Sequence, residues 1–249
     1  MPGTAAFGKF IRILQFIADQ PGRSSVAEIA AALRMPRTTV HRIVAALQHE
    51  GLVEDKDGLG LGLRLVSLAW RSLDQSGLRQ LARPSLDRLN AALDETVHLA
   101  VNSGAEMVYL DKLESRRAVR MTSRLGTRVT LHASAVGKSW LAAQPDAVVE
   151  ALIPTLDYQR FTPHTIATPE ALRAEIAATR HRGYALDLQE RELDICCYGM
   201  AVVTAGGVQA CVSVSLPRYR FEDLPADRAQ AALSECVRGI AAALGGARV

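Results

Sequence analysis

The N-terminal part of the chain carries hydrophobic residues at the three- and four-residue intervals of amphipathic helices. This spacing predicts helices over residues 7–18, 26–33 and 36–49. Ser25 and Glu28 have the spacing of a capping box, in which each side chain bonds the backbone amide of the other residue. The second helix is therefore expected to begin directly after Ser25.

A β-hairpin pattern follows the third helical segment. Residues 52–55 and 59–63 flank Lys56-Asp57-Gly58, which contains the glycine that tight hairpin turns favour. Three helices followed by a hairpin predict a winged helix-turn-helix domain over residues 1–63. A further helical pattern predicts a linker helix within residues 64–77.

The remaining residues, 78–249, alternate between helical and strand patterns. Helices are expected over residues 78–93, from about residue 135, over 169–182 and over 226–244. Strands are expected near residues 96–102, 106–113, 118–123, 184–188, 195–204 and 208–216. Strands joined by short turns and flanked by helices predict the α+β class, with a mainly antiparallel sheet in one C-terminal domain.

The net charge of the chain does not by itself indicate a partner. The 249 residues include 29 basic and 26 acidic side chains, and the formal charge of +3 is too small to imply nucleic-acid binding. The distribution is more informative, because Glu28 is the one acid between positions 23 and 42, where the chain also has Arg23, Arg34, Arg37 and Arg42. The basic residues therefore gather on the predicted helix-turn-helix.

The cysteines and the apolar stretches indicate a reduced, cytoplasmic protein. The four cysteines, at positions 196, 197, 211 and 236, show no CxxC spacing. Charged residues interrupt the apolar stretch near the N-terminus, so no signal peptide is expected. The most apolar later stretch, 195–216, contains Gly206-Gly207 and is expected to form two strands and a turn, with no contact with a membrane.

The predicted third helix holds the expected DNA-reading residues. In a helix-turn-helix the second helix of the motif enters the major groove with its N-terminal residues toward the base edges. Arg37, Thr38, His41 and Arg42 occupy that end of the helix. The expected DNA-binding set is completed by residues around this helix, mostly as phosphate contacts: Arg23, Ser25, Arg34, Thr39 and Lys56. In the alternative, these charges only form a solvated face.

Several segments also resemble a known family. Leu33 to Arg42 is similar to the turn and recognition helix of IclR-type transcription regulators. Further segments similar to this family follow in the expected order: Thr96–Ala100, Leu131–Lys138, Arg160–Thr165, Arg182–Asp187 and Ser213–Ser215. The resemblance runs from about residue 7 to the C-terminus. It implies a winged helix-turn-helix, a linker helix used in dimerisation, and a GAF-like α/β C-terminal domain that binds a small effector.

The resemblance also implies which residues bind the effector. Ala135, Val136 and Gly137 match a loop whose amides meet an anionic ligand group at the start of a helix. Asp187 matches an acid that accepts a hydrogen bond from a ligand hydroxyl. The other matched positions are Met121, His132, Cys197, Ser213 and Ser215. In the alternative, the serines bond only neighbouring backbone and Cys197 is a small core residue.

The chain departs from the family pattern near this pocket. Ala201 stands where the family usually carries proline, and Asp194-Ile195 stands where it usually carries Gly-Val. Tyr198 and Met200 are bulkier than the small residues often found at their positions. These differences bear on which ligand fits, and a small organic acid is the expected effector class.

Three short patterns that suggest other chemistry are not supported by their context. Gly137-Lys138-Ser139 resembles the end of a P-loop, but His132 stands where that motif needs glycine. Cys196 and Cys197 are adjacent on a predicted strand, where successive side chains point to opposite faces, so a disulfide between them is not expected. The spacing of His98, His132 and Cys197 is not a metal signature.

The sequence therefore predicts a transcription regulator rather than an enzyme. It contains no nucleophile elbow and no visible nucleophile–base pair, and no cofactor or metal is expected. The expected partners are palindromic double-stranded operator DNA, a small organic acid and a second copy of the chain, with a homotetramer as the larger alternative. Two rival functions remain: a DNA-binding dimeric protein without a ligand, and a metabolite-converting enzyme.

Overall fold

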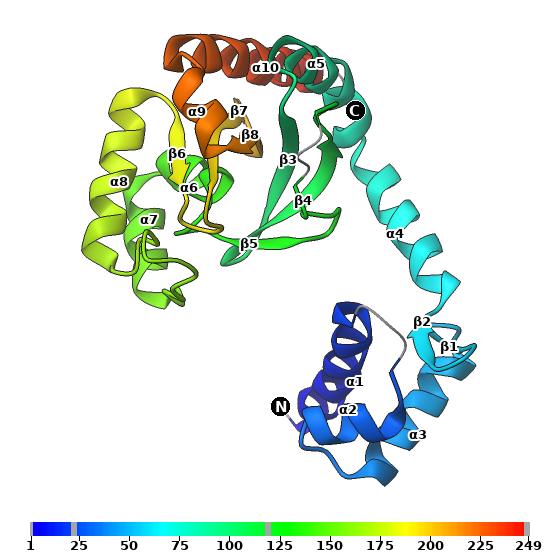
Figure 1. Cartoon of the computed structure of the whole chain (residues 1–249). Coiled ribbons are helices and arrows are strands. Elements are labelled where there is room, and N and C mark those ends of the chain that lie inside the picture. The colour runs from blue at the N-terminus through cyan, green and yellow to red at the C-terminus, as the bar shows by residue number, and fades with distance from the viewer. Residues whose placement is uncertain (1, 21–23, 118–120, 247–249) are drawn as a thin grey trace. The chain divides into compact units, whose positions relative to one another are not determined.

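The computed structural model describes residues 2–20, 24–117 and 121–246 (Figure 1). The contacts between residues divide the chain into two compact units, Met1–Ser76 and Gly77–Val249. Among the described residues, no helix is both long and apolar enough to cross a membrane.

The N-terminal unit is a three-helix cluster with a two-stranded wing. Its elements are α1 (Pro2–Asp19), α2 (Val26–Ala32), α3 (Arg37–His49), β1 (Val53–Asp55), β2 (Leu59–Leu61) and α4 (Leu63–Ser76). The core is built from the apolar faces of α1, α2 and α3, which bury Ile13, Ile29 and Val40 completely. This arrangement confirms the winged helix-turn-helix that the sequence pattern predicts.

Local signals in the sequence explain where these helices begin. The Ser25 hydroxyl accepts a hydrogen bond from the Glu28 amide at 3.2 Å, and the Glu28 carboxylate accepts one from the Ser25 amide at 2.7 Å. The capping box is therefore confirmed. Pro36 precedes α3 in an extended conformation, so its missing N–H leaves no helical bond unmade. Arg34, in the turn between α2 and α3, has a positive φ of 50°.

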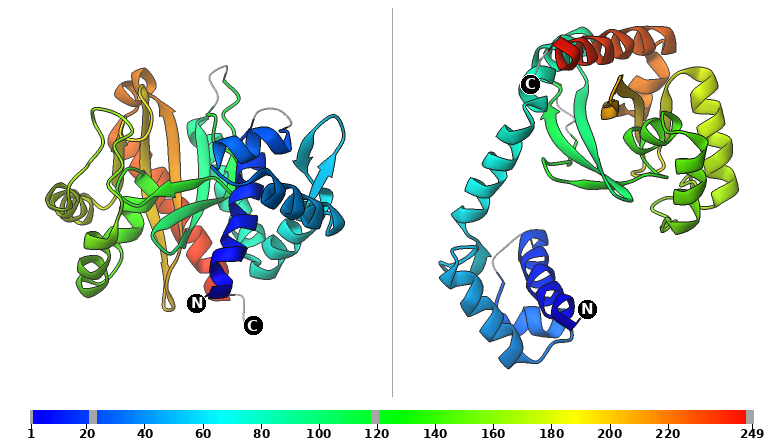
Figure 2. Two further views of the ribbon diagram at one scale, coloured as in Figure 1. Left: turned by 90° about the horizontal axis from the view of Figure 1, so that it is seen from below. Right: turned by 180° about the vertical axis from the view of Figure 1, so that it is seen from behind.

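The C-terminal unit is a six-stranded antiparallel sheet with helices on both faces (Figure 2). The strand order is β5-β4-β3-β8-β7-β6. The strands are β3 (Thr96–Ser103), β4 (Glu106–Leu113), β5 (Arg128–Thr130), β6 (Ala185–Leu188), β7 (Ile195–Thr204) and β8 (Gly207–Pro217). The helices are α5 (Leu78–Leu93), α6 (Ala135–Ala142), α7 (Asp146–Leu152), the 3₁₀ turn η1 (Ile153–Thr155), α8 (Pro169–Arg182), α9 (Arg218–Asp223) and α10 (Ala226–Gly246).

Two separate hydrophobic cores hold these layers together. Helices α5 and α10 lie side by side and pack with Val97 and Leu99 of the sheet (Figure 2). Helices α6, α7 and α8 pack against the other face, where Ala100 and Met107 contribute to the second core. Because side chains alternate along a strand, His98 projects from β3 on the opposite side from Val97 and Leu99. The second face is where the polar residues of the sheet gather.

One predicted strand is wrong. Residues 118–123 were expected to form a strand, but 118–120 lie outside the described residues and 121–123 are not in a strand. The third strand of this region is β5 instead. The backbone of the 121–123 segment is held by a side chain rather than by a strand ladder, because the Lys112 ammonium donates to the carbonyl oxygens of Met121 and Ser123, each at 2.8 Å. The sequence pattern also does not predict α7, η1 or α9.

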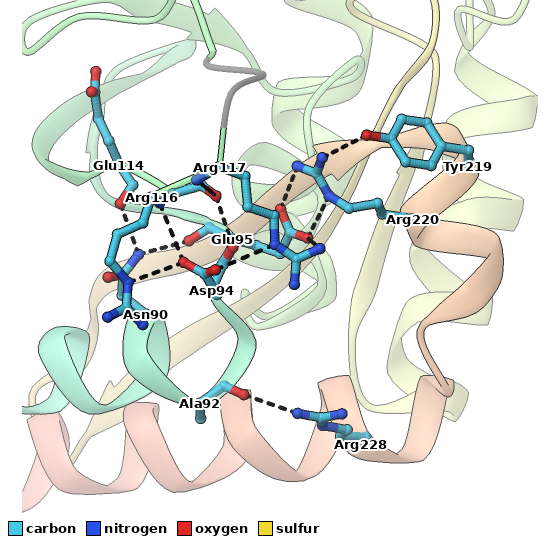
Figure 3. Close-up of polar contacts among 11 residues, drawn as sticks. Asn90, Ala92, Asp94, Glu95, Glu114, Arg116, Arg117, Tyr219, Arg220 and Arg228 are labelled. Atoms are coloured by element: carbon cyan, nitrogen blue, oxygen red, sulfur yellow. Dashed lines mark hydrogen bonds and ion pairs between the residues drawn. The ribbon is translucent and has the colours of Figure 1, made fainter.

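A cluster of ion pairs fastens the end of α5 to the segment that follows β4 (Figure 3). The guanidinium of Arg220 donates to both oxygens of the buried Glu95 carboxylate, at 2.7 and 2.8 Å. The neighbouring Asp94 accepts from the backbone amide of Arg116 at 3.2 Å and from the guanidinium of Arg117 at 3.3 Å. This cluster joins α5, α9 and the chain after β4 at one corner of the sheet (Figure 3).

Candidate functional site

The first two turns of α3 present the predicted DNA-reading side chains to solvent. The helix buries Val40, Ile43, Val44 and Leu47 on one face. Arg37, Thr38, His41 and Arg42 are exposed on the remaining surface, and Thr39 is half-buried. The structure therefore brings these five residues together on one helix, as the helical spacing requires.

The other predicted DNA-binding residues lie on neighbouring elements. Ser25 caps α2 with its hydroxyl, and its side chain is exposed. Arg34 is exposed in the turn before α3. Lys56 is exposed at the hairpin turn, with its ammonium 3.1 Å from the Glu54 carboxylate. Arg23 lies outside the described residues.

The C-terminal unit contains a cavity of about 440 Å³ on the polar side of its sheet. Many of the predicted effector-binding residues line it: Met121, Ala135, Val136, Asp187, Cys197, Ser213 and Ser215. Ser213 and Ser215 alternate on β8 and so face the cavity together. The cavity is further lined by residues that the sequence analysis did not assign to it, among them His98, Tyr109, Ser123, Arg124 and Arg191.

Two predicted pocket residues do not line this cavity. His132 lies against a second cavity of about 320 Å³, where its Nε2 is 3.0 Å from the carbonyl oxygen of Gln159. Gly137 packs against the backbone, since a Cβ there would lie 2.5 Å from the Leu131 Cα. Its amide donates to the Ser134 hydroxyl at 3.1 Å. Gly137 thus allows a close approach of α6 to the chain before it, and its amide is already bonded.

The N-terminus of α6 opens onto the cavity. Ser134 caps the helix, and both Ala135 and Val136 line the cavity. Amides in the first turn of a helix have no partner within the helix, and the helix dipole adds partial positive charge there. Gly199 on β7 makes this position possible, because a Cβ at Gly199 would lie 2.5 Å from the Ala135 carbonyl oxygen. This end of the cavity is suited to an anionic group.

A chain of polar contacts forms another wall of the cavity. The Cys197 thiol donates to the Ser215 hydroxyl at 3.1 Å, and that hydroxyl lies 3.4 Å from Nδ1 of His98. Nε2 of His98 is 2.7 Å from the Ser123 hydroxyl. The His98 ring stacks on Tyr109 with centroids 4.3 Å apart. The wall therefore offers hydroxyl, thiol and imidazole groups in fixed positions.

The titratable groups of this wall are held in their neutral forms. Burial, and then the positive charge of Lys112, lower the pKa of His98 to about 3. Burial raises the pKa of the Cys197 thiol, and the nearby Asp187 adds to that effect. A neutral imidazole has one donor and one acceptor nitrogen, so His98 acts in hydrogen bonding and not as a charge.

Asp187 is the buried acid of the cavity. Asp187 is only 4% exposed, and its Oδ1 accepts a hydrogen bond from the Glu190 amide at 2.8 Å. Burial, and next the negative charge of Glu190, raise the pKa of Asp187 to about 7. Asp187 is therefore close to half-protonated at neutral pH.

Among the cavity residues that the sequence analysis missed, His98 has a signal in the sequence that could have identified it. His98 lies between apolar residues at a strand position where alternation points it away from the core, which marks it as a candidate. Arg191 has no such signal. Its guanidinium lies 4.0 Å from the centre of the Phe161 ring, a contact between residues of two loops.

The groups that line this cavity are suited to binding a small anionic ligand. Helix amides and Arg191 suit a carboxylate, while the serines, Cys197 and His98 suit polar atoms of a neutral body. Among the described residues, no group of three or more His, Cys, Asp and Glu side chains is placed to hold a metal ion.

Comparisons with known proteins identify the family of both units. The bacterial transcriptional regulator IclR C-terminal family matches residues 70–242, and the IclR helix-turn-helix domain matches residues 8–57. The HTH-type transcriptional regulator XynR of Escherichia coli (strain K12) is 30% identical over 98% of this chain and 99% of that protein. The matched proteins are named as regulators, in agreement with the expectation that the chain is not an enzyme.

Solved structures show the same architecture. The Thermotoga maritima IclR structure has a TM-score of 0.75 at 31% identity, covering 97% of this chain and 99% of that one. An IclR homolog from Microbacterium hydrocarbonoxydans, complexed with 4-hydroxybenzoate, has a TM-score of 0.82 at 27% identity, covering 97% of this chain and all of the other. This chain is therefore a member of the IclR family of bacterial transcriptional regulators, with a DNA-binding helix-turn-helix and a C-terminal effector domain.

Proposed function

We propose that this regulator binds a small organic acid in the 440 Å³ cavity of its C-terminal unit, and that the acid changes its affinity for operator DNA. The proposal rests on one observation: the N-terminus of α6 and the polar side chains of β7 and β8 line the same cavity. Its volume lies within the range of small-molecule sites, about 300–1,000 Å³. The relative that was crystallised with 4-hydroxybenzoate supports a carboxylate ligand for this chain.

The DNA-binding role is proposed for the exposed side chains of α3. Arg37, Thr38, His41 and Arg42 read base edges, and Thr39 contacts phosphate. Ser25, Arg34 and Lys56 add contacts from the flanking elements, and Arg23 belongs to the same proposal. The DNA-binding domain comprises residues 1–63, the linker helix 64–77 and the effector domain 78–249. DNA as the partner implies a cytoplasmic protein.

The regulator acts as a homodimer on a palindromic operator, because one winged helix reads only a short half-site. The exposed apolar side chains of α4 support this proposal: Leu63, Val66 and Trp70 share one face of the helix and are each at least half accessible in the single chain. Such a stripe on a helix is suited to packing against a second copy. Sedimentation at micromolar concentration should give a dimer or a tetramer, and a monomer alone would contradict the proposal.

The ligand proposal is tested by calorimetric titration of the full-length protein with a panel of small carboxylic acids that includes 4-hydroxybenzoate. We expect an acid to bind the wild type and to bind S215A more weakly, because the cavity loses a hydroxyl. A matched control, S103A, removes an exposed hydroxyl from the end of β3, outside the cavity, and should leave the affinity unchanged. Equal binding to the wild type and S215A, or no binding by any acid, would contradict the proposal.

A further inference from the structure

A buried ion pair lies directly behind the cavity wall and is not part of it. Lys138 on α6 is fully buried, and Glu190, in the loop after β6, is 6% exposed. The Lys138 ammonium lies 2.5 Å from Oε1 of Glu190. Burying two charges costs several kcal/mol per ion before their attraction is counted, so such a pair is not explained by stability alone.

Glu190 connects this ion pair to the cavity through Asp187. The Glu190 backbone amide donates to Oδ1 of Asp187, and its side chain accepts from the Leu188 amide at 3.4 Å. The Thr165 hydroxyl donates to the Glu190 carbonyl oxygen at 2.6 Å. Contacts with Lys138 and Thr165 therefore fix the loop that carries Glu190. In this arrangement the Glu190 carboxylate contacts Lys138, while Asp187 lies in the cavity wall.

The charges of this cluster do not balance. It holds two buried carboxyl groups, Asp187 and Glu190, but one buried cation, Lys138. Glu190 contacts the ammonium directly, so Lys138 favours its ionised form, whereas Asp187 has only the more distant influence of that charge. Burial raises the pKa of both carboxyls, but the proton is best placed on Asp187. The other charged or titratable groups around Asp187 are Cys196, whose pKa Asp187 also raises, and six residues that line the same cavity: His98, Tyr109, Arg124, Arg191, Glu192 and Cys197.

We propose that Glu190, kept ionised by its ion pair with Lys138, is a positioning residue that holds Asp187 as a neutral hydrogen-bond donor, so that the cavity selects ligands with an acceptor oxygen at that wall. This inference rests on the proposed binding of a ligand in the cavity. Oδ1 accepts from the Glu190 amide, so a proton on Oδ2 leaves that bond intact. The Glu190 and Arg191 amides both favour the ionised carboxyl, but burial and the charge of Glu190 have the larger effect on its pKa. Asp187 then donates to a carbonyl or carboxylate oxygen, which differs from the acceptor role that the sequence resemblance implies.

The positioning role can be tested without a ligand. Full-length protein labelled with ¹³C at the aspartate carboxyls is titrated by NMR, with the Asp187 signal assigned by its loss in D187N. The wild-type Asp187 should titrate near pH 7, and E190Q should lower that midpoint, because the neighbouring negative charge is removed. E190D keeps the charge and should retain a raised midpoint. E235Q removes an exposed carboxylate from α10, away from the cavity, and serves as the control, with no change expected.

The titration gives a clear contradiction as well as support. A wild-type Asp187 that titrates in the ordinary aspartate range, about 3.9, would overturn the proposal even if E190Q failed to fold. A folded E190Q with an unchanged Asp187 midpoint would also overturn it. Near-ultraviolet circular dichroism establishes whether E190Q and E190D retain native packing.

The selection step is tested with 4-hydroxybenzoate as the probe, between pH 6 and 8.5. Affinity for the wild type should fall above pH 7, by up to tenfold per pH unit, because Asp187 loses the donated proton. In D187N, whose amide does not titrate, this dependence should vanish. A pH-independent affinity for the wild type would overturn the selection step. If neither this probe nor any acid of the panel binds at any pH, the proposed ligand site fails, and with it the selection step, while a raised Asp187 midpoint would still support the positioning role.

Discussion

In the part of the chain that the structure describes, the two units of this regulator differ in whether they bury charged residues. In the N-terminal unit, Arg37 and Arg42 are exposed on α3, where water solvates them. In the C-terminal unit, the pairs Lys138–Glu190 and Glu95–Arg220 are buried. An exposed charge needs no partner within the protein, whereas a buried charge is tolerated only with one.

The difference also lies in the sequence separation of the partners. The buried pairs join residues that are 52 and 125 positions apart, so they form only when the whole sheet is assembled. The recognition helix α3 is defined by its own spacing and by Pro36, which directly precedes it. A substitution on α3 should therefore affect function with little loss of stability, while one in a buried pair should affect the fold as well.

The largest effect is expected from breaking the Glu95–Arg220 pair. E95Q leaves the Arg220 guanidinium buried without its carboxylate, which should lower the free energy of unfolding by about 3–5 kcal/mol. The exposed pair on the same helix, Arg218–Glu222, provides the control, since E222Q should cost about 0–1 kcal/mol. Urea unfolding followed by Trp140 fluorescence in a W70F background measures both. Equal stabilities of E95Q and E222Q would contradict the comparison.

The second effect is a change in how stability depends on pH. The pKa of Asp187 is about 7 in the folded protein, above the ordinary 3.8, so the folded state holds a proton that the unfolded state releases. The free energy of unfolding should therefore fall as pH rises from about 4 to about 7, by about 1.4 kcal/mol for each unit of pKa difference.

D187N should remove this dependence and be more stable than the wild type at pH 8, by a few times the roughly 1.4 kcal/mol of one pKa unit. Urea unfolding at pH 5 and pH 8 tests it. D223N alters an exposed carboxyl and should follow the wild type at both values. A D187N variant that is less stable than the wild type at pH 8 would show that folding does not raise the pKa of Asp187.

The third effect concerns DNA alone. R42A should weaken operator binding by about 10- to 100-fold, the equivalent of the roughly 1–3 kcal/mol of a specific base contact. The C-terminal unit should unfold as in the wild type. K9A removes an exposed charge from α1 and should bind the operator nearly normally. Fluorescence anisotropy at fixed salt measures both affinities, and an R42A variant with wild-type affinity would remove the base-reading role of α3.

The smallest effect is expected from the cap of α2. S25A removes the hydroxyl that accepts from the Glu28 amide, which should cost about 1 kcal/mol of stability. S67A, an exposed serine within α4, lacks such a contact and is the control. Urea unfolding followed by Trp70 fluorescence in a W140F background reports on this unit. If S25A and S67A were equally stable, the capping box would contribute nothing measurable.

Much of the fold was predictable because its signals are local. Helix α8 begins at Pro169 with Thr168 as its N-cap, as the sequence signals require, and both its ends agree with the prediction. Strand β7 agrees as well, since apolar runs bounded by turn residues determine both ends. The face of α3 that is buried follows from its period of 3.6 residues.

The cavity was predictable only in part, for physical reasons. Ser213 and Ser215 share a face because they alternate on one strand. The backbone of Ser123 is held beside the cavity by a hydrogen bond from the Lys112 ammonium. Residues 118–123 contain no sequence pattern that predicts this contact. His132 was expected at the cavity, but its position depends on the carbonyl oxygen of Gln159, from a loop distant in sequence.

The central claim is that one chain joins operator recognition to the sensing of an acid. The most direct measurement is a mobility shift of the full-length protein on genomic fragments that it selects, with salt titrated and small carboxylic acids added in turn. The account predicts sharp, competitor-resistant binding whose affinity one acid changes. Binding that is only non-specific, falls steeply with salt and ignores every acid would contradict it.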